Sequence, residues 1–111
     1  MSAFKHYQTF SKATSTSVAL IDISDAIAEV AKETQGFIQV IITTETESLV
    51  VKFGDSSVVA DDTVADDAYP AGNYYCLAST VQDINIDRGV THASVKAAGV
   101  GSVKISIGYE V

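Results

Sequence analysis

The segment that most constrains the fold runs from Gly101 to Val111, where apolar and polar residues alternate. Every second position in it is apolar, at Val103, Ile105, Ile107 and Tyr109. A period of two places these side chains on one face of the chain, so the sequence predicts a half-buried β-strand here. The pattern reaches the last residue, which predicts that the C-terminal residues belong to a sheet and form neither a loose tail nor a helix.

Similar short runs recur along the rest of the chain. The sequence predicts strands over residues 18–23, 37–44, 49–53, 73–79, 81–87 and 91–97. Turn signals such as Tyr69-Pro-Ala-Gly72 and Arg88-Gly89 separate them. A chain of 111 residues is long enough for one domain. Short strands at this spacing predict an all-β fold, an antiparallel β-sandwich or jelly roll with at most one short helix.

Residues 24–34 are the ambiguous part of this pattern. Ser24 is a residue type suited to an N-cap, and Ile27 and Val30 would share one helical face. These signals favour a short helix that ends before Gln35. Continued β-structure is the alternative, because strands are expected on both sides and tertiary context can override local propensity.

Residues 1–13 differ in composition from the rest and predict an N-terminal arm, followed by a single β-sandwich domain over residues 14–111. The arm carries the aromatic residues Phe4, Tyr7 and Phe10 among basic ones, and no acidic residue precedes position 22. Aromatic side chains at this density favour docking against a neighbouring subunit. A frayed terminus is the alternative.

The second expected strand is apolar on both faces. Ile38, Val40 and Ile42 share one face, whereas Phe37 and Ile41 lie on the other. This pattern predicts that the strand is covered from both sides. The hydrophobic content of 47% also indicates apolar surface that another subunit covers. The candidate self-association residues are therefore Phe4, Tyr7, Phe10, Phe37 and Ile41.

The segment from Asp55 to Asp67 is the part of the chain that most resembles a binding site. It contains five aspartates within thirteen residues and repeats Val-Ala-Asp-Asp at 59–62 and 64–67. Carboxylate oxygens suit calcium, but the spacing lacks the central glycine and distal glutamate of an EF-hand loop. The prediction is an exposed acidic loop with no metal site, and a calcium site is the alternative.

Composition and charge argue against several classes of function. The net charge of −7 disfavours nucleic acid as a partner, because phosphates would be repelled. The single cysteine, Cys76, excludes an intramolecular disulfide and is expected to be buried. The two histidines, His6 and His92, lack a supporting nucleophile or metal-ligand pattern, so neither an enzyme nor a cofactor is predicted. No apolar run approaches the ~18 residues of a membrane helix, and the N-terminus shows no signal-peptide pattern.

Four segments together resemble small structural proteins of tailed bacteriophage virions. They are Val50-Val-Lys-Phe-Gly54, Ser56-Ser-Val-Val-Ala60, Pro70-Ala-Gly72 and the segment from Gly99 to Gly108. The resemblance covers residues 37–111, and the chain departs from it by ending in Tyr109-Glu-Val111 in place of a Gly-x-Gly ending. Among these proteins the chain is similar to head decoration (cement) proteins, which have β-sandwich or jelly-roll folds.

The resemblance implies a protein made in the host cytoplasm and placed on the capsid surface of the virion. Its expected partners are the major capsid protein and further copies of itself, as a homotrimer or homodimer, with neither nucleic acid nor a membrane. A neck or tail connector or a tail-tube subunit is the first alternative. A receptor- or carbohydrate-binding module is the second, because it could use the acidic loop and the nearby tyrosines Tyr69, Tyr74 and Tyr75.

Overall fold

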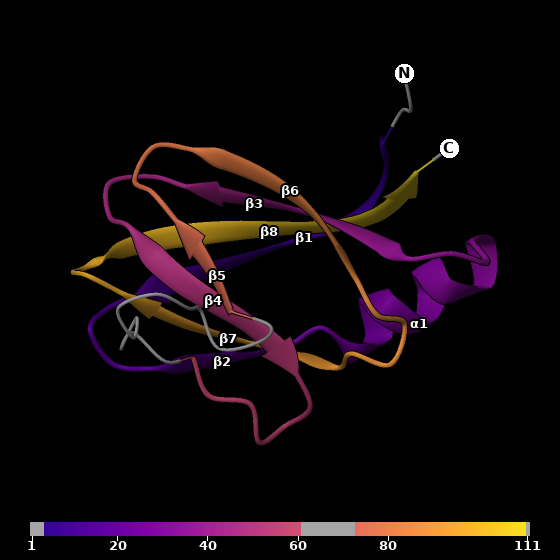
Figure 1. The fold of residues 1–111 in the computed structure, drawn as a ribbon, viewed down its shortest axis with the longest axis horizontal. Coiled ribbons are helices and arrows are strands. Elements are labelled where there is room, and N and C mark those ends of the chain that lie inside the picture. Colours follow the sequence, from indigo (N-terminus) through magenta and orange to yellow (C-terminus); the bar gives the residue numbers. More distant parts are fainter. Residues whose placement is uncertain (1–3, 61–72, 111) are drawn as a thin grey trace.

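Two four-stranded β-sheets pack face to face in the computed structural model, which describes residues 4–60 and 73–110 (Figure 1). Within these residues the chain forms eight strands and one helix. In chain order they are β1 (Phe4–Thr14), β2 (Ala19–Asp22), α1 (Ser24–Glu33), β3 (Ile38–Thr44), β4 (Leu49–Gly54), β5 (Asn73–Cys76), β6 (Val81–Ile86), β7 (His92–Ala97) and β8 (Gly101–Glu110). The predicted all-β architecture with one short helix is confirmed.

The strand order identifies the sandwich as a jelly roll. The first sheet has the order β1-β8-β3-β6 and the second sheet the order β2-β7-β4-β5. Every neighbouring pair in both sheets is antiparallel. Eight antiparallel strands divided in this way between two facing sheets are the arrangement of a jelly roll.

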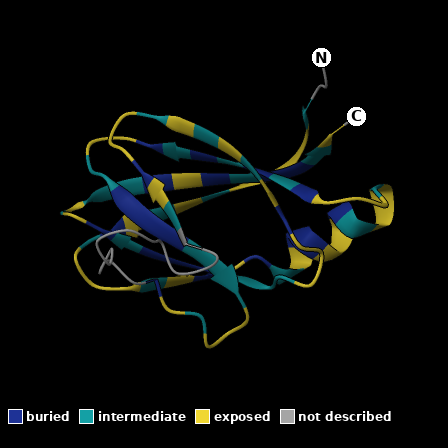
Figure 2. Cartoon of the chain, viewed as in Figure 1, coloured by how far each residue is buried: buried dark blue, intermediate teal, exposed yellow. Residues whose placement is uncertain are grey.

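The hydrophobic core lies between the two sheets and is built from alternating positions. In β3 the predicted alternation is complete, because residues 38, 40, 42 and 44 are buried and the three between them are half-buried. Figure 2 shows buried segments on strands of both sheets. The largest fully buried side chains are Ile23, Ile38, Ile42, Leu49, Ile105, Ile107, Val30, Val40, Val51, Val95, Val103 and Cys76. Burial of one such aliphatic side chain is worth about 1.5–3 kcal/mol, so the hydrophobic effect holds the sheets together.

α1 covers one end of the sandwich, where it contacts β8, β1 and β3 (Figure 1). Its buried face includes Ile27 and Val30, so the helical interpretation of this segment is confirmed. The N-cap position is Ile23, however, and Ser24 is the first helical residue. The backbone N–H of Ser24 donates to the Asp22 carboxylate at 2.9 Å, which satisfies a free donor of the first turn. Within the described residues no helix is both long and apolar enough to cross a lipid bilayer.

The N-terminal residues form part of the sandwich and not a separate arm. β1 pairs with β8 along its whole length, from Phe4 opposite Glu110 to Thr14 opposite Gly101. The predicted division into an arm over residues 1–13 and a domain over residues 14–111 is therefore corrected: the described residues 4–13 belong to the sandwich. A β-bulge between residues 6 and 8 shifts the register and interrupts the period-two pattern, which explains why the sequence did not show a strand here.

β5 ends at Cys76, three residues before the predicted end of its strand. The following residues form a turn that the buried Thr44 at the end of β3 holds in place. The Thr44 hydroxyl donates to the Leu77 carbonyl at 2.5 Å and accepts from the N–H of Thr80 at 3.0 Å. Ser79 adopts a positive φ of 58° within this turn, a conformation that a continuing strand does not allow.

Candidate functional site

Figure 1 shows that α1 and both chain ends lie at one end of the sandwich. Aromatic side chains near this end are exposed to solvent. Phe37, between α1 and β3, is 68% exposed, and Tyr7 of β1 is 48% exposed. Tyr7 lies near Lys32 of α1. Phe4 is opposite Glu110 in the β1–β8 register. Phe37 and Glu110 line the same surface hollow. Phe4, Tyr7 and Phe37 are named the aromatic end below.

Arg88 fixes the loop that carries Phe37. Its guanidinium donates hydrogen bonds to the carbonyl oxygens of Ala31 at 2.8 Å and Gly36 at 3.4 Å, and also to the carbonyl of Thr34. A helix C-terminus leaves carbonyls unpaired and carries a partial negative charge, so a cation is favourable there. The sequence placed Arg88 only in a turn, and no local pattern could show its contact with residues more than fifty positions away.

Phe37 lines two open hollows. One has a volume of about 240 Å³ and lies beside Asp87 and Arg88. The other has a volume of about 350 Å³ and lies beside Asn85 and Glu110. A projecting aromatic ring with a polar and charged surround has the composition of a protein–protein contact surface.

Gly108 of β8 makes room for Phe4 on the outer face of the first sheet. A Cβ atom at Gly108 would lie 2.7 Å from Cζ of the Phe4 ring and would overlap the carbonyl oxygen of Lys5. Phe4 also contacts His6, with the ring centroids 6.2 Å apart. Glycine within a strand often marks such a close backbone approach. No local sequence pattern indicated this role of Gly108, because it depends on contacts with β1.

The structure separates the five candidates for self-association, because the aromatic end contains only three of them. Phe10 packs against the core, since its register partner Ile105 faces the core. Ile41 is half-buried on the outer face of the first sheet, where its register partners are Ser106 and Asp83. The predicted cover of this strand from both sides is not supplied by the described part of the chain.

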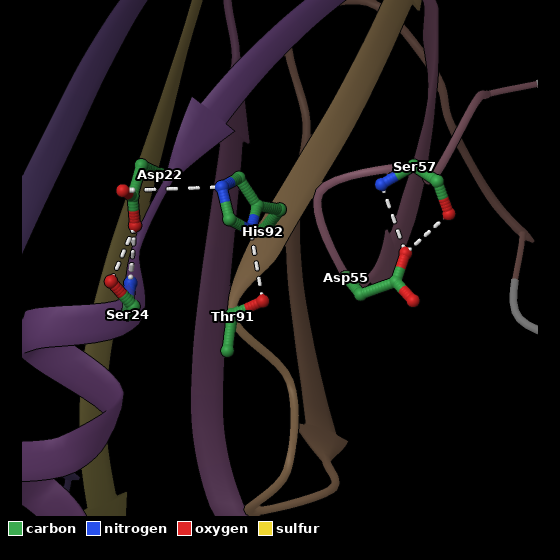
Figure 3. A network of polar contacts seen from close by, with 6 residues as sticks. All are labelled: Asp22, Ser24, Asp55, Ser57, Thr91 and His92. Atoms are coloured by element: carbon green, nitrogen blue, oxygen red, sulfur yellow. Dashed lines mark hydrogen bonds and ion pairs between the residues drawn. The ribbon is translucent and has the colours of Figure 1, made fainter.

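A cluster of polar side chains lies where β2 ends and β7 begins (Figure 3). The Asp22 carboxylate is 3.9 Å from Nε2 of His92, and the Thr91 hydroxyl is 2.8 Å from Nδ1 of the same ring. Hydrogen bonds from the hydroxyl and N–H of Ser24, with a smaller contribution from His92, hold the pKa of Asp22 below its ordinary value. The Ser24 hydroxyl donates to the carboxylate and not to the imidazole, so these side chains lack the serine–histidine–aspartate order of a hydrolase. The cluster instead ties the start of α1 to β7.

The first part of the acidic segment is anchored to the second sheet. The N–H of Ala60 donates to the buried Ser94 hydroxyl at 2.8 Å, so Ala60 is buried where an exposed loop was predicted. Asp55 is exposed, as expected, and accepts hydrogen bonds from the hydroxyl and N–H of Ser57 (Figure 3). These bonds lower the pKa of Asp55. No sequence signal pointed to Ser94, because it lies 34 positions from Ala60.

The remaining four aspartates of the predicted loop, at 61–67, lie outside the described residues, as does Tyr69. Across residues 4–60 and 73–110, no group of three or more histidine, cysteine, aspartate or glutamate side chains could hold a metal ion. Of the other two tyrosines, Tyr74 packs edge-on against Phe53, with ring centroids 6.1 Å apart, and Tyr75 is 37% exposed. Tyr74 and Tyr75 are adjacent in β5 and point to opposite faces of the sheet, so these two tyrosines do not share one patch.

Cys76 is buried in the core, as the sequence predicted. Burial raises the pKa of its thiol to about 11. The thiolate is the reactive form of cysteine, so this side chain is unreactive at neutral pH.

Comparison with known proteins gives one informative likeness. No family model and no curated protein sequence matches this chain. The fold is similar to that of a protein from Bacillus endospore appendages, which are described as a novel family of disulfide-linked pili. The superposition covers 100% of this chain and 91% of that chain, with a TM-score of 0.51 and 12% sequence identity. At this level of identity the likeness shows the shared fold alone.

Proposed function

We propose that this protein is a structural subunit of a bacteriophage virion, a capsid decoration (cement) protein that binds the outer head lattice and stabilises it. The observation that carries the proposal is the aromatic end, where Phe37 projects from a rigid jelly roll with 68% of its surface exposed. The sequence resemblance to decoration proteins supports the same role. The proposed partner is the major capsid protein, and the proposed location is the capsid surface.

The aromatic end suits this role for energetic reasons. A buried aromatic anchor is a common source of binding energy in protein interfaces, and its pre-set position lowers the entropic cost of binding. Arg88 supplies that pre-set position by holding the loop on both sides of Thr34. The net charge of −7 keeps the subunit away from the packaged DNA and directs its contacts to protein.

The test is co-sedimentation of the purified protein with empty capsids, assembled from the major capsid protein of the genome that encodes this chain. Phe37→Ser should weaken binding roughly tenfold or more, because it removes an interface anchor. Val100→Ser is the matched control, since Val100 is 84% exposed and lies between β7 and β8, away from α1. Unchanged binding of Phe37→Ser would contradict the role of the aromatic end, and no binding of the unaltered protein would contradict the decoration function.

A self-assembling subunit of a pilus-like fibre is the second candidate, and the likeness to the Bacillus appendage protein favours it. One property of this chain differs from disulfide-linked pili: its single cysteine is buried and fully inaccessible. Fibres of this chain would therefore have to form without disulfides between folded subunits. Electron microscopy of the concentrated protein alone separates the candidates, because fibres would favour the second and discrete particles the first.

A further inference from the structure

The first sheet of the jelly roll has two open edges. β1 and β6 are its outer strands, and within the described residues each pairs with only one neighbour. An unpaired edge presents a row of backbone donors and acceptors that can accept another strand. The two edges therefore offer a route by which copies of the chain could join.

β6 lacks the features with which proteins usually block an open edge. It contains no lysine and no proline, and its register with β3 runs from Ile86 to Val81 without a bulge. Its only charged side chain, Asp83, points to the outer face and not toward the core. Val81 is 66% exposed, and Ile84 is only half-buried. As far as residues 4–60 and 73–110 go, this edge is thus open to pairing and has apolar surface left to cover.

β1 is compatible with that edge in direction and length. Because neighbouring strands alternate in direction through β1, β8, β3 and β6, the two edge strands are antiparallel to each other. A second copy placed beside the first in the same orientation would therefore set its β1 antiparallel to β6. Beyond the bulge, β1 runs regularly from Gln8 to Thr14, which matches the six residues of β6.

We propose that copies of this chain join edge to edge, with β1 of one copy pairing with β6 of the next, so that the first sheet continues between copies. This inference rests on the proposed function, because the resemblance to decoration proteins implies association with further copies of the chain. Registers two residues apart all keep core-facing residues on one face. The proposed one places Phe10 opposite Ile84 of the next copy, and Ala13 opposite its Val81. Both pairs bring together apolar side chains, and the polar Ser11 meets Asp83.

Charge favours this pairing over pairing of identical edges. β1 carries Lys5, His6 and Lys12 with no acidic residue, whereas β6 carries Asp83 with no basic one. Two β1 strands, or two β6 strands, would bring like charges together, which destabilises cross-strand pairs. Pairing of β1 with β6 is a heterologous contact, so it generates closed rings such as trimers, which fit the decoration function, or open filaments, which fit a fibre subunit, and not a two-fold dimer.

Disulfide trapping tests the pairing in the full-length protein. Ser11→Cys and Asp83→Cys would place two thiols on directly opposed residues, within the 4.4–6.8 Å Cα separation that a disulfide needs. Cys76 should not interfere, because burial raises its pKa to about 11. Under mild oxidation, the double variant should give covalent oligomers larger than dimers on a non-reducing gel. An equal mixture of the two single variants should give only a mixed dimer.

The control is the double variant Thr9→Cys with Val81→Cys, which has thiols on the same strands but about 13 Å out of register. It should cross-link far less than the in-register pair. Covalent dimers of either single variant alone would show pairing of identical edges and overturn the inference. Oligomers in sedimentation without in-register cross-links would overturn it and leave self-association intact, and a monomer at every concentration would overturn both. Capsid binding, measured separately, tests the decoration function itself.

Discussion

At the scale of single residues, Gly108 is the described glycine that leaves least room for a side chain. Gly108→Ala would place a methyl group against the Lys5 carbonyl and the Phe4 ring, so β1 would have to move away from β8. Overpacking of this kind costs about 1–3 kcal/mol. We expect Gly108→Ala to lower the free energy of unfolding by this amount in urea denaturation, and to weaken capsid binding because Phe4 is displaced.

Gly36 is the matched control for that substitution. A Cβ atom at Gly36 would meet nothing within 4 Å, and the residue does not need a left-handed conformation. Gly36→Ala should therefore leave stability unchanged or raise it by about 0.4–1 kcal/mol, through lower entropy of the unfolded chain. Equal losses of stability in the two variants would show that close contact between β1 and β8 is not what requires glycine at 108.

At the scale of elements, the end of α1 depends on one side chain from a distant turn. Arg88→Met keeps the aliphatic part of the side chain but removes all three hydrogen bonds to carbonyls at the helix end. We expect a loss of about 1–2 kcal/mol in thermal or urea unfolding, together with faster hydrogen exchange over residues 31–36. The stability of Arg88→Lys should fall between that of Arg88→Met and that of the unaltered protein, because an ammonium group keeps the charge but not the planar fork.

Lys104→Met is the control for Arg88→Met, because it also removes one exposed positive charge. Lys104 is also exposed, and its nearest acidic partner, Glu45, is 3.9 Å away. Surface pairs of this kind contribute little, so this variant should stay close to the unaltered protein. A loss as large as that of Arg88→Met would mean that net charge, and not the helix-end contact, explains the effect.

Elements with a clear period could be predicted from the sequence, and those that depend on distant partners could not. The alternation in β3 and β8 and the helical spacing of Ile27 and Val30 are local signals, and the structure agrees with them. β1 was missed because its bulge changes the phase of the pattern midway. The same holds for the candidate site. The exposure of Phe37 depends on which distant segments pack against it, and the burial of Phe10 depends on the pairing of β1 with β8. Neither can be read from the local sequence.

At the scale of the whole molecule, deletion of the N-terminal residues tests whether they are a detachable arm or a strand that the sandwich requires. A variant without residues 1–13 would lack nearly all of β1. The edge of β8 would then be exposed, because β1 pairs with β8 along its whole length. We expect this variant to lose most of the 5–15 kcal/mol typical of a domain and to be insoluble or to unfold without a cooperative transition. Circular dichroism during urea unfolding measures this. A cooperative transition with an unchanged midpoint would show that residues 1–13 act as a detachable arm.

The central position of β8 has a consequence for synthesis of the protein. Of the described strands, β8 is the last to leave the ribosome, and it lies between β1, the first of them, and β3. The first sheet therefore lacks its central strand until residues 101–110 are available. Nascent chains must hold β1 unpaired until β8 has been synthesised, and folding then requires closure of the long loop that joins these two strands. The sandwich should therefore assemble only after release of these residues, and products of premature termination would expose apolar strands to aggregation and degradation.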